Sequence, residues 1–297
     1  MVLLMSGCPG WFAESLAWKP AGSKASRGIC QELFGRALGP NLADLNSRPS
    51  TQIAGDVYWA LDIPEDRETT FDIGSLEGGP DFAVQEDLSA DDVEKPVRSA
   101  GTRLEEGLRK DIEKHLLSID PRRGWTVERK GDVADFEQYK HMKLVRDFRK
   151  KDATFRQLSG HSYLVKTDVR VGVPNPDPSR LPLLHACVSS KLTIRSDRAQ
   201  NVKAEFDVLS RIKNGRQPHF TVVTAEPLPS RLASIAEGYG ALDAMYHLLY
   251  EEVDEALRRL SKKAGSKLAK QMEDWEVLTG SGRIRPYGLL AQTFATS

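Results

Sequence analysis

Runs of β-forming residues alternate with segments of helical spacing over residues 160–250, and this alternation constrains the fold more than any other feature. The predicted elements, in order, are strands over 168–173 and 183–188, a helix over 195–214, a strand over 219–225, a break at Pro227 and Pro229, and a helix over 241–263. Strands that alternate with helices indicate an α/β core, because each helix buries its apolar stripe against a face of the sheet.

The N-terminal part of the chain predicts fewer elements. These are a helix over 27–38, an irregular acidic insertion over 56–94, a helix over 101–118, a strand from Gly124 and a helix over 135–155. The helix over 101–118 has the clearest pattern, because Leu104, Leu108 and Ile112 recur at helical spacing.

The charge of the chain is balanced in total but uneven along its length. It holds 42 basic and 42 acidic residues, and the segment 56–94 contains thirteen acidic residues against the single Arg67. The remainder carries a surplus of twelve positive charges, so a basic face for nucleic acid is compatible with a net charge of zero. Surface charge scattered without a partner explains the composition equally well.

Composition also narrows the compartment and the class of protein. Cys8, Cys30 and Cys187 form neither a disulfide framework nor a metal-ligand cluster, which favours a reducing cytoplasm. No apolar run approaches the roughly 20 residues that span a bilayer, so we expect no membrane partner. The chain has no internal repeat and no glycine-rich nucleotide-binding motif.

Three residues are candidates for phosphodiester chemistry. Asp168 and Lys191 lie on predicted strands near the points where the chain leaves the sheet, and Glu205 lies on the helix that follows. Carboxylates bind Mg²⁺, and a lysine orients or deprotonates the attacking water. Solvated surface charge is the ordinary explanation for each residue taken alone.

The helix start at Arg195-Ser196-Asp197-Arg198 is a candidate for reading DNA bases. Arginine binds the O6 and N7 atoms of guanine with two hydrogen bonds, and aspartate accepts from N4 of cytosine. The alternative is that Ser196 or Asp197 caps the helix and that the arginines are solvated.

The stretch LPLLHACVSSKLTIRSDRAQNVKAEF, followed by KNGRQPHFTVVTAEPLPSRLASIA, resembles the NgoMIV-type restriction endonucleases, type II enzymes of the PD-(D/E)XK superfamily with CCGG-core palindromic targets. The resemblance covers about residues 160–250, with weaker matches at LEEGL and ADLNSRPSTQIAG. It implies a restriction-endonuclease-like α/β core with a central mixed β-sheet flanked by helices, in a single domain over 1–297.

The resemblance also implies a catalytic site. The common nuclease pattern has an acid two residues before the lysine, where this chain has Ser189, and the family moves that carboxylate to Glu205. The implied roles are metal ligation by Asp168, Glu205 and the Ser190 carbonyl, assistance to the water by Lys191, and a second metal position at Glu105. Two Mg²⁺ ions per site are expected.

For DNA recognition, the resemblance assigns the inner CCGG bases to Arg195, Asp197 and Arg198, and the flanking G·C pair to Asp44 and Arg231. The implied target is double-stranded GCCGGC, cut after its first base to leave four-base 5′ overhangs. A palindrome requires a two-fold symmetric homodimer, and the family implies pairing into a homotetramer in a prokaryotic cytoplasm.

Two other functions fit the same residues. A DNA repair or recombination nuclease would use the same metal site but would read DNA structure instead of sequence. A non-catalytic DNA-binding protein would retain the fold alone, although the intact set of Asp168, Lys191 and Glu205 argues against it.

Overall fold

The computed structural model describes residues 7–12, 42, 47–61, 100–152, 157, 166–194, 196–237, 240–262 and 266–297. Its helices are α3 (Arg48–Ala60), α5 (Ala100–Ile119), α6 (His141–Lys151), α8 (Ser196–Ile212), α9 (Pro229–Ala236), α10 (Tyr250–Ser261), α11 (Ser266–Gly280) and α12 (Leu290–Ala295), with short 3-10 turns at Val133–Asp135, Glu137–Tyr139 and Tyr287–Leu289. The strands are β1 (Thr126–Asp132), β2 (Lys166–Val173), β3 (Leu183–Lys191), β4 (His219–Thr224), β5 (Ala244–His247) and β6 (Ile284–Pro286).

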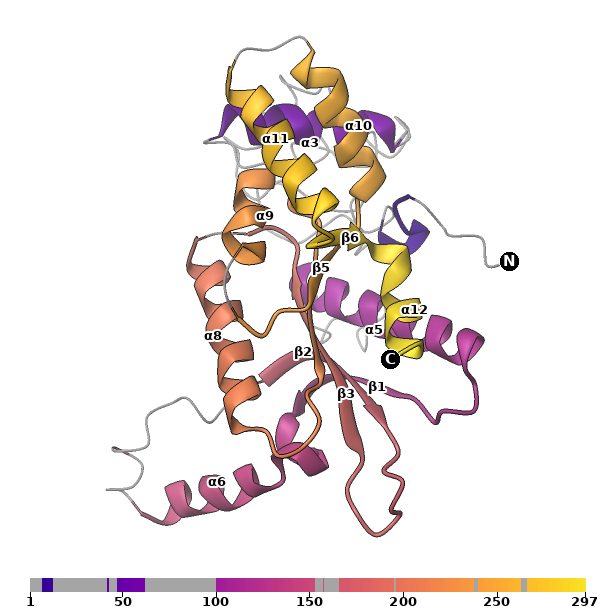
Figure 1. The fold of residues 1–297 in the computed structure, drawn as a ribbon, viewed down its shortest axis with the longest axis vertical. Helices are drawn as coiled ribbons and strands as arrows, with labels where there is room; N and C mark the ends of the chain where they lie inside the picture. The colour runs from indigo at the N-terminus through magenta and orange to yellow at the C-terminus, as the bar shows by residue number, and fades with distance from the viewer. Residues whose placement is uncertain are drawn as a thin grey trace, which may run out of the picture.

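A single mixed sheet forms the centre of the described part of the chain (Figure 1). Its strands lie in the order β1-β2-β3-β4-β5-β6. Strand β2 is antiparallel to both of its neighbours, β1 and β3, and the strands from β3 to β6 are parallel. The predicted α/β class with a mixed sheet flanked by helices is therefore confirmed.

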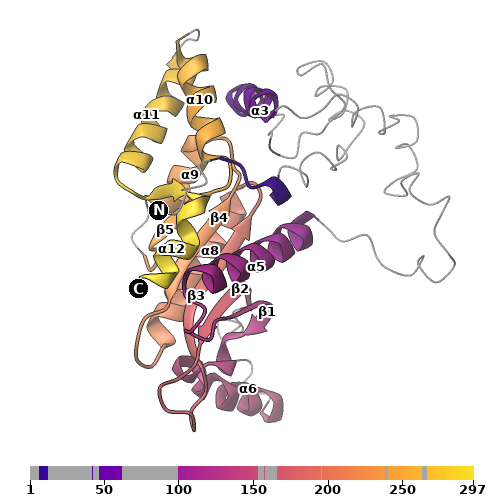
Figure 2. The same ribbon diagram turned by 90° about the vertical axis from the view of Figure 1, so that its right-hand side faces the viewer.

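Helices cover both faces of this sheet. Side chains of successive strand residues point to opposite faces, so Val169 and Arg170 of β2 mark the two sides. On the Val169 side lies α5, which crosses β1, β2 and β3 (Figure 2) and places its buried leucines against the sheet. On the other side lies α8, where Phe206 stacks on Phe220 of β4 with ring centroids 5.0 Å apart.

The predicted helix over 241–263 is wrong in its first half. Residues Ala244–His247 form the strand β5, all four of them buried between β4 and β6, and α10 begins only at Tyr250. A four-residue apolar run has no period that separates a buried strand from a helix. The sheet neighbours on both sides decide the conformation here.

Three further boundaries differ from the sequence expectations. Pro229 starts α9 instead of breaking the chain, since proline is well tolerated in the first turn of a helix. The helix predicted over 135–155 begins only at His141, after two 3-10 turns. Residues 56–60 belong to α3, whereas residues 62–94 of the acidic insertion and the predicted helix over 27–38 lie outside the described residues.

Helices α10 and α11 form the upper part of the molecule in Figure 1, where α3 lies against α10. Arg259 of α10 pairs with Asp56 of α3 at 2.9 Å. Trp275 of α11 is fully buried, and its Nε1 donates to Asp254 at 3.0 Å. In the described ranges, no helix is long and apolar enough to cross a membrane.

Two adjacent leucines in α5 test how this helix is held on the sheet. Leu116 is fully buried, whereas Leu117 is 45% exposed. Leu116→Ala should lower the free energy of unfolding by about 2–5 kcal/mol, because it removes core contacts and leaves a cavity. Leu117→Ala is the matched control and should change it by less than about 1 kcal/mol. Urea denaturation measures both, and equal effects would contradict the placement of α5.

Candidate active site

The antiparallel pairing of β2 with β3 brings Asp168 next to Ser189, Ser190 and Lys191. Its carboxylate accepts a hydrogen bond from the Ser190 backbone N–H and one from Lys191 Nζ, each at 2.8 Å. The Ser189 hydroxyl lies 3.4 Å from the same oxygen, Oδ2. Asp168 and Lys191 are 26% and 19% exposed, so the pair is partly shielded from solvent and still reachable from it.

Glu205 reaches this pair from α8. It lies one residue before Phe206, whose stacking on Phe220 holds this turn of the helix against the sheet. Asp168, Ser189 and Glu205 line one small pocket, together with Phe206 and Leu209. Burial raises the pKa of the Glu205 carboxyl; Lys191 lowers that pKa and Asp168 raises it, and the net shift is upward. The Glu205 carboxyl is therefore close enough to Asp168 and Lys191 for their charges to shift its pKa.

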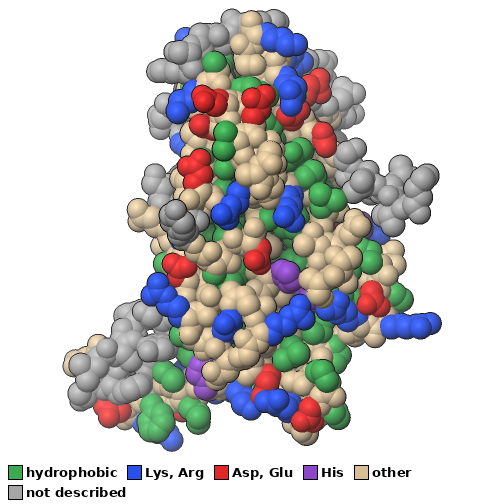
Figure 3. All heavy atoms as spheres, viewed as in Figure 1, with side chains coloured by type: hydrophobic (Ala, Val, Ile, Leu, Met, Phe, Trp, Pro, Cys, Tyr) green, Lys and Arg blue, Asp and Glu red, His purple; other side chains and the backbone are tan. Residues whose placement is uncertain are grey.

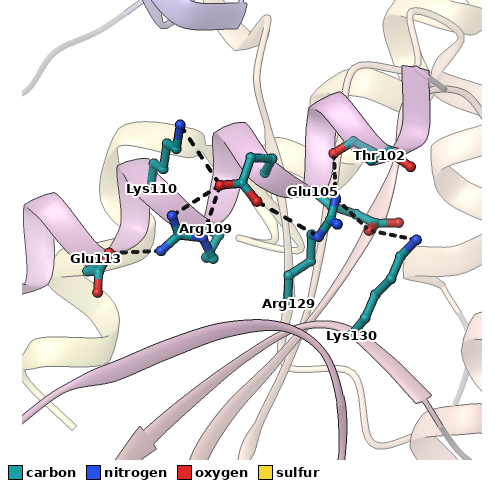
Figure 4. Close-up of polar contacts among 8 residues, drawn as sticks. Thr102, Glu105, Arg109, Lys110, Glu113, Arg129 and Lys130 are labelled. Atoms are coloured by element: carbon teal, nitrogen blue, oxygen red, sulfur yellow. Dashed lines mark hydrogen bonds and ion pairs between the residues drawn. The ribbon is translucent and has the colours of Figure 1, made fainter. Parts of the chain in front are cut away.

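Glu105 approaches from the opposite side, on α5 (Figure 4). Its Oε2 is buried without a hydrogen-bond partner and lies 3.6 Å from Lys130 Nζ and 3.8 Å from Arg129 Nη1. Burial raises the pKa of Glu105 and the Asp168 charge adds to the increase, while Lys130 and Arg129 oppose it. The two cations of β1 therefore offset a desolvated carboxylate beside Asp168.

Lys130 has an unusual backbone for a strand residue. Its φ of 53° lies in the left-handed region, where among the described residues every other positive φ belongs to a glycine. The flanking residues Arg129 and Gly131 pair with Val169 and Thr167, so Lys130 stands across from Asp168. A strained conformation at such a position is common next to functional sites.

The acidic side chains fit a hard divalent cation. Carboxylates are the protein oxygens that Mg²⁺ prefers, and one or two of them commonly suffice because water and phosphate complete the shell. Asp168 and Glu205 share one pocket, and Glu105 has an unpartnered buried oxygen. Within the described ranges, no three His, Cys, Asp or Glu side chains gather closely enough to form a metal cluster by themselves.

The residues predicted to read DNA are only partly placed. Asp44 and Arg195 lie outside the described residues, and Asp197 and Arg198 are described by their backbone alone, in the first turn of α8. Arg231 lies in the first turn of α9, with Nη1 3.9 Å from Glu226 Oε2. The two helices that carry Asp197, Arg198 and Arg231 are neighbours: α9 contacts α8 and lies above it in Figure 1.

Three charged residues next to the predicted site residues were not predicted from the sequence to have a role. Glu226 is a fully buried acid between β4 and α9, and Arg129 and Lys130 flank Glu105. Glu226 carried a usable signal, because it is the one charged residue in the apolar run from Phe220 to Leu228. Arg129 and Lys130 carried none, since basic residues in a half-exposed strand are common.

The uneven distribution of charge along the sequence is compatible with a basic face for nucleic acid. The side of the molecule in Figure 3 does not have a continuous basic face. Lysine and arginine side chains there are interspersed with aspartates and glutamates. Many ion pairs among the described residues are of this surface kind, such as Arg258 with Asp254 at 2.7 Å. Exposed pairs of this sort contribute little to stability.

Comparisons with known proteins agree with the motif-based resemblance. Residues 174–279 match the family model described as NgoMIV restriction enzyme. The type II restriction enzyme NgoMIV of Neisseria gonorrhoeae is 33% identical over 166 residues, which cover 46% of this chain and 58% of that protein. The chain thus spans little more than half the length of this relative, and over that region the predicted resemblance is confirmed.

Two solved structures align with most of the chain at low identity. The crystal structure of the pre-specific restriction endonuclease BsaWI–DNA complex has a TM-score of 0.35 and 13% identity, and the alignment covers 96% of this chain and 93% of that one. The restriction endonuclease PspGI–substrate DNA complex has a TM-score of 0.32 and 12% identity, with 94% of each chain covered.

The raised pKa of Glu205 predicts that this carboxyl lowers the free energy of unfolding at neutral pH but not in acid. Because the folded-state pKa lies above that of the unfolded chain, the associated stability is present below the unfolded pKa and is lost as pH rises through the folded pKa. Glu205→Gln keeps the size of the side chain and removes the charge. Without divalent ions, we expect this variant to have a higher Tm than the wild type at neutral pH and the same Tm in acid.

Differential scanning calorimetry at several pH values measures this difference. The control is Glu237→Gln, which changes an exposed glutamate at the end of α9 and should leave the Tm unchanged throughout. A lower Tm for Glu205→Gln at neutral pH would show that the carboxylate is stabilised by its neighbours, contrary to the raised pKa.

Proposed function

We propose that this chain is a Mg²⁺-dependent type II restriction endonuclease that cuts double-stranded DNA at a palindrome with a CCGG core. The observation that carries the proposal is the Asp168–Lys191 contact at 2.8 Å, with Glu205 on the wall of the same pocket. An acid, a lysine and a second acid at one end of a strand pair form the donor set that metal-assisted phosphodiester hydrolysis needs. The family match over 174–279 supports the same activity.

In this proposal Asp168, Glu205 and the Ser190 carbonyl hold a Mg²⁺ ion, and Glu105 serves a second one. The Ser190 N–H already points to Asp168, and the N–H and C=O of one strand residue project to the same side of the strand. When bound, the metal activates water and offsets charge on the phosphate. The donor atoms come from β2, β3, α8 and α5, so sheet and helix packing together fix the site.

Lys191 orients the attacking water and offsets negative charge at the scissile phosphate. Its ammonium group is held by Asp168, which keeps it at the end of β3. The hydrolysis breaks the bond between phosphorus and the 3′ oxygen. It leaves a 5′-phosphate and a 3′-hydroxyl group, and the proton of the water passes to the leaving oxygen through solvent.

The proposed target is GCCGGC, cut after the first base. Asp197 and Arg198 in the first turn of α8, together with Arg195, read the inner bases, and Arg231 and Asp44 read the flanking pair. Bidentate arginine–guanine contacts suit such a G- and C-rich site. A palindromic target requires a homodimer, and we propose that two dimers pair into a tetramer in a bacterial cytoplasm.

Digestion of a sequenced plasmid with purified protein and Mg²⁺ tests this function. Discrete fragments whose ends map to G/CCGGC are expected, with four-base 5′ overhangs. Branched and mismatched duplexes without a CCGG core belong in the same assay. If these are cut and the plasmid is not, the chain is a structure-specific repair or recombination nuclease. If no DNA is cut, the proposal is wrong.

Lys191→Ala tests the catalytic assignment. We expect cleavage to fall by at least about 10²–10⁴-fold, the contribution of a positioned proton-transfer group, while binding to the target duplex is retained in a mobility-shift assay. Lys270→Ala changes a 71% exposed lysine of α11 and serves as the control. Unchanged cleavage by a folded Lys191→Ala protein would remove Lys191 from the proposed mechanism.

A further inference from the structure

Glu226 is the most completely enclosed carboxylate outside the proposed catalytic site in the described part of the chain. It follows β4, precedes α9 and has no exposed surface. Its Oε2 accepts a hydrogen bond from the Ile194 backbone N–H at 2.7 Å, and its Oε1 accepts one from the Leu228 N–H at 3.1 Å. Arg231 Nη1 lies 3.9 Å from Oε2. A buried charge is expensive unless it is partnered in this way.

The partners of Glu226 explain why an acid stands here. Ile194 and Leu228 present N–H groups, and Arg231 presents a guanidinium, so these three groups all offer donors to the side chain. A carboxylate accepts on both oxygens, whereas a glutamine would turn an NH₂ group towards one of these donors. Glutamine also lacks the charge that faces Arg231.

The backbone of Glu226 is fixed as firmly as its side chain. Its N–H donates to Thr224 Oγ1 at 3.1 Å, and its C=O accepts from His247 Nε2 at 2.9 Å. The other ring nitrogen of His247 accepts from the Leu249 N–H at 3.1 Å, which makes Nε2 the donor. Burial lowers the pKa of His247 to about 4, so the ring stays neutral at physiological pH. The hydrogen bonds with Thr224 and His247 thus hold the backbone of Glu226 in place next to the ends of β4 and β5.

Glu226 joins the two elements to which base recognition is assigned. Ile194 is the residue directly before Arg195, and Arg231 lies in the first turn of α9. The loop before α8 is tied to the same place a second time, because the Ala225 N–H donates to the Leu192 carbonyl at 3.2 Å. Ile194 itself is 1% exposed, so its side chain anchors the loop in the core.

We infer that Glu226 is a positioning residue that sets discrimination at the inner and the flanking base pairs together. Its carboxylate fixes the backbone of Ile194, the residue before Arg195 in the sequence, and it lies beside the Arg231 guanidinium that is proposed to read the flanking pair. The side-chain partners Ile194, Leu228 and Arg231 are not among the proposed metal ligands. This inference rests on the proposed function, because it assigns the control of sequence discrimination within it.

A purely structural role for Glu226 predicts a different result. Loss of a structural contact lowers the folded fraction, and the rates on all DNA duplexes then fall by the same factor. Loss of a positioning contact changes the ratio of rates between duplexes. The discriminating quantity is therefore the ratio of kcat/KM on GCCGGC to kcat/KM on a duplex with one pair changed.

The experiment compares Glu226→Gln with the wild type on three duplexes: the target, the target with its flanking pair replaced, and the target with an inner pair replaced. We expect discrimination to fall by about tenfold or more at both positions, since hydrogen bonds to charged groups and bidentate base contacts are lost or misaligned. Arg231→Ala, in the same assay, should lose discrimination at the flanking pair alone. Circular dichroism and Tm establish that each variant is folded.

Glu252→Gln is the matched control. Glu252 also accepts a backbone amide, from Cys8 at 2.8 Å, but it lies in the first turn of α10. Its substitution should lower activity, if at all, equally on the three duplexes. If Glu226→Gln does not fold, Glu226→Asp replaces it; this variant keeps the charge, withdraws the oxygens by one methylene and should lose discrimination partly at both positions.

The possible outcomes separate the two proposals. Unchanged ratios in a folded Glu226 variant, or a change at the flanking pair alone, would overturn this inference and leave the nuclease function intact. A wild-type protein that cuts none of the duplexes would overturn the proposed function, and the inference with it.

Discussion

The antiparallel pairing of β2 with β3 is the interaction on which the candidate site depends. It places Asp168 opposite the last residues of β3, where the Ser190 N–H and Lys191 Nζ both donate to one carboxylate oxygen at 2.8 Å. Because side chains alternate between the faces of a strand, a shift of one residue would turn Asp168 away from α8 and Glu205. The buried valines Val169 and Val188, paired in the register, hold it in place. The chemistry of the site thus follows from the packing of the sheet.

The charges of the candidate site lower the free energy of unfolding, and packing elsewhere in the fold must offset this loss. Glu205 and Glu105 both have raised pKa values, chiefly because they are partly removed from water, and both lie close to the charge of Asp168. Lys191 and Lys130 reduce the repulsion on either side, and Lys130 does so from a left-handed backbone. Carboxylates held together in this way bind a divalent cation well because the cation removes the repulsion that the empty site retains. Local destabilisation of this kind is typical where function needs charges that folding alone would disperse.

An element can be predicted from the sequence when it is long enough to show a period and when one of its sides is buried and the other exposed. The helix over 101–118 and the strands that carry Asp168 and Lys191 were predicted, because long or alternating patterns record which side of the element is buried. The strand Ala244–His247 was missed, since a run buried on both faces keeps no such record. Asp168, Lys191 and Glu205 could be selected by residue type and family resemblance. That Asp168 and Glu205 line one pocket, and that Lys191 contacts Asp168, depends on sheet register and on the packing of Phe206 against Phe220. The contacts of Glu226 join residues 32 apart in the chain, and no local pattern encodes them.

The parallel pair of β3 and β4 explains why the residues proposed for cleavage and those proposed for base recognition can share one edge of the sheet. Lys191 and Thr224 are register partners and the last residues of their strands, so both chains leave the sheet at the same level. In open α/β sheets, this carboxyl edge is where functional loops gather. The loop after β3 leads within a few residues from Lys191 to the start of α8, and the loop after β4 leads through Glu226 to Arg231. A displacement of either loop would therefore be passed to the other through Glu226, whereas the Asp168–Lys191 contact rests on the antiparallel half of the sheet. In the proposed function, cleavage and base recognition therefore depend on different strand pairs, which meet at β3.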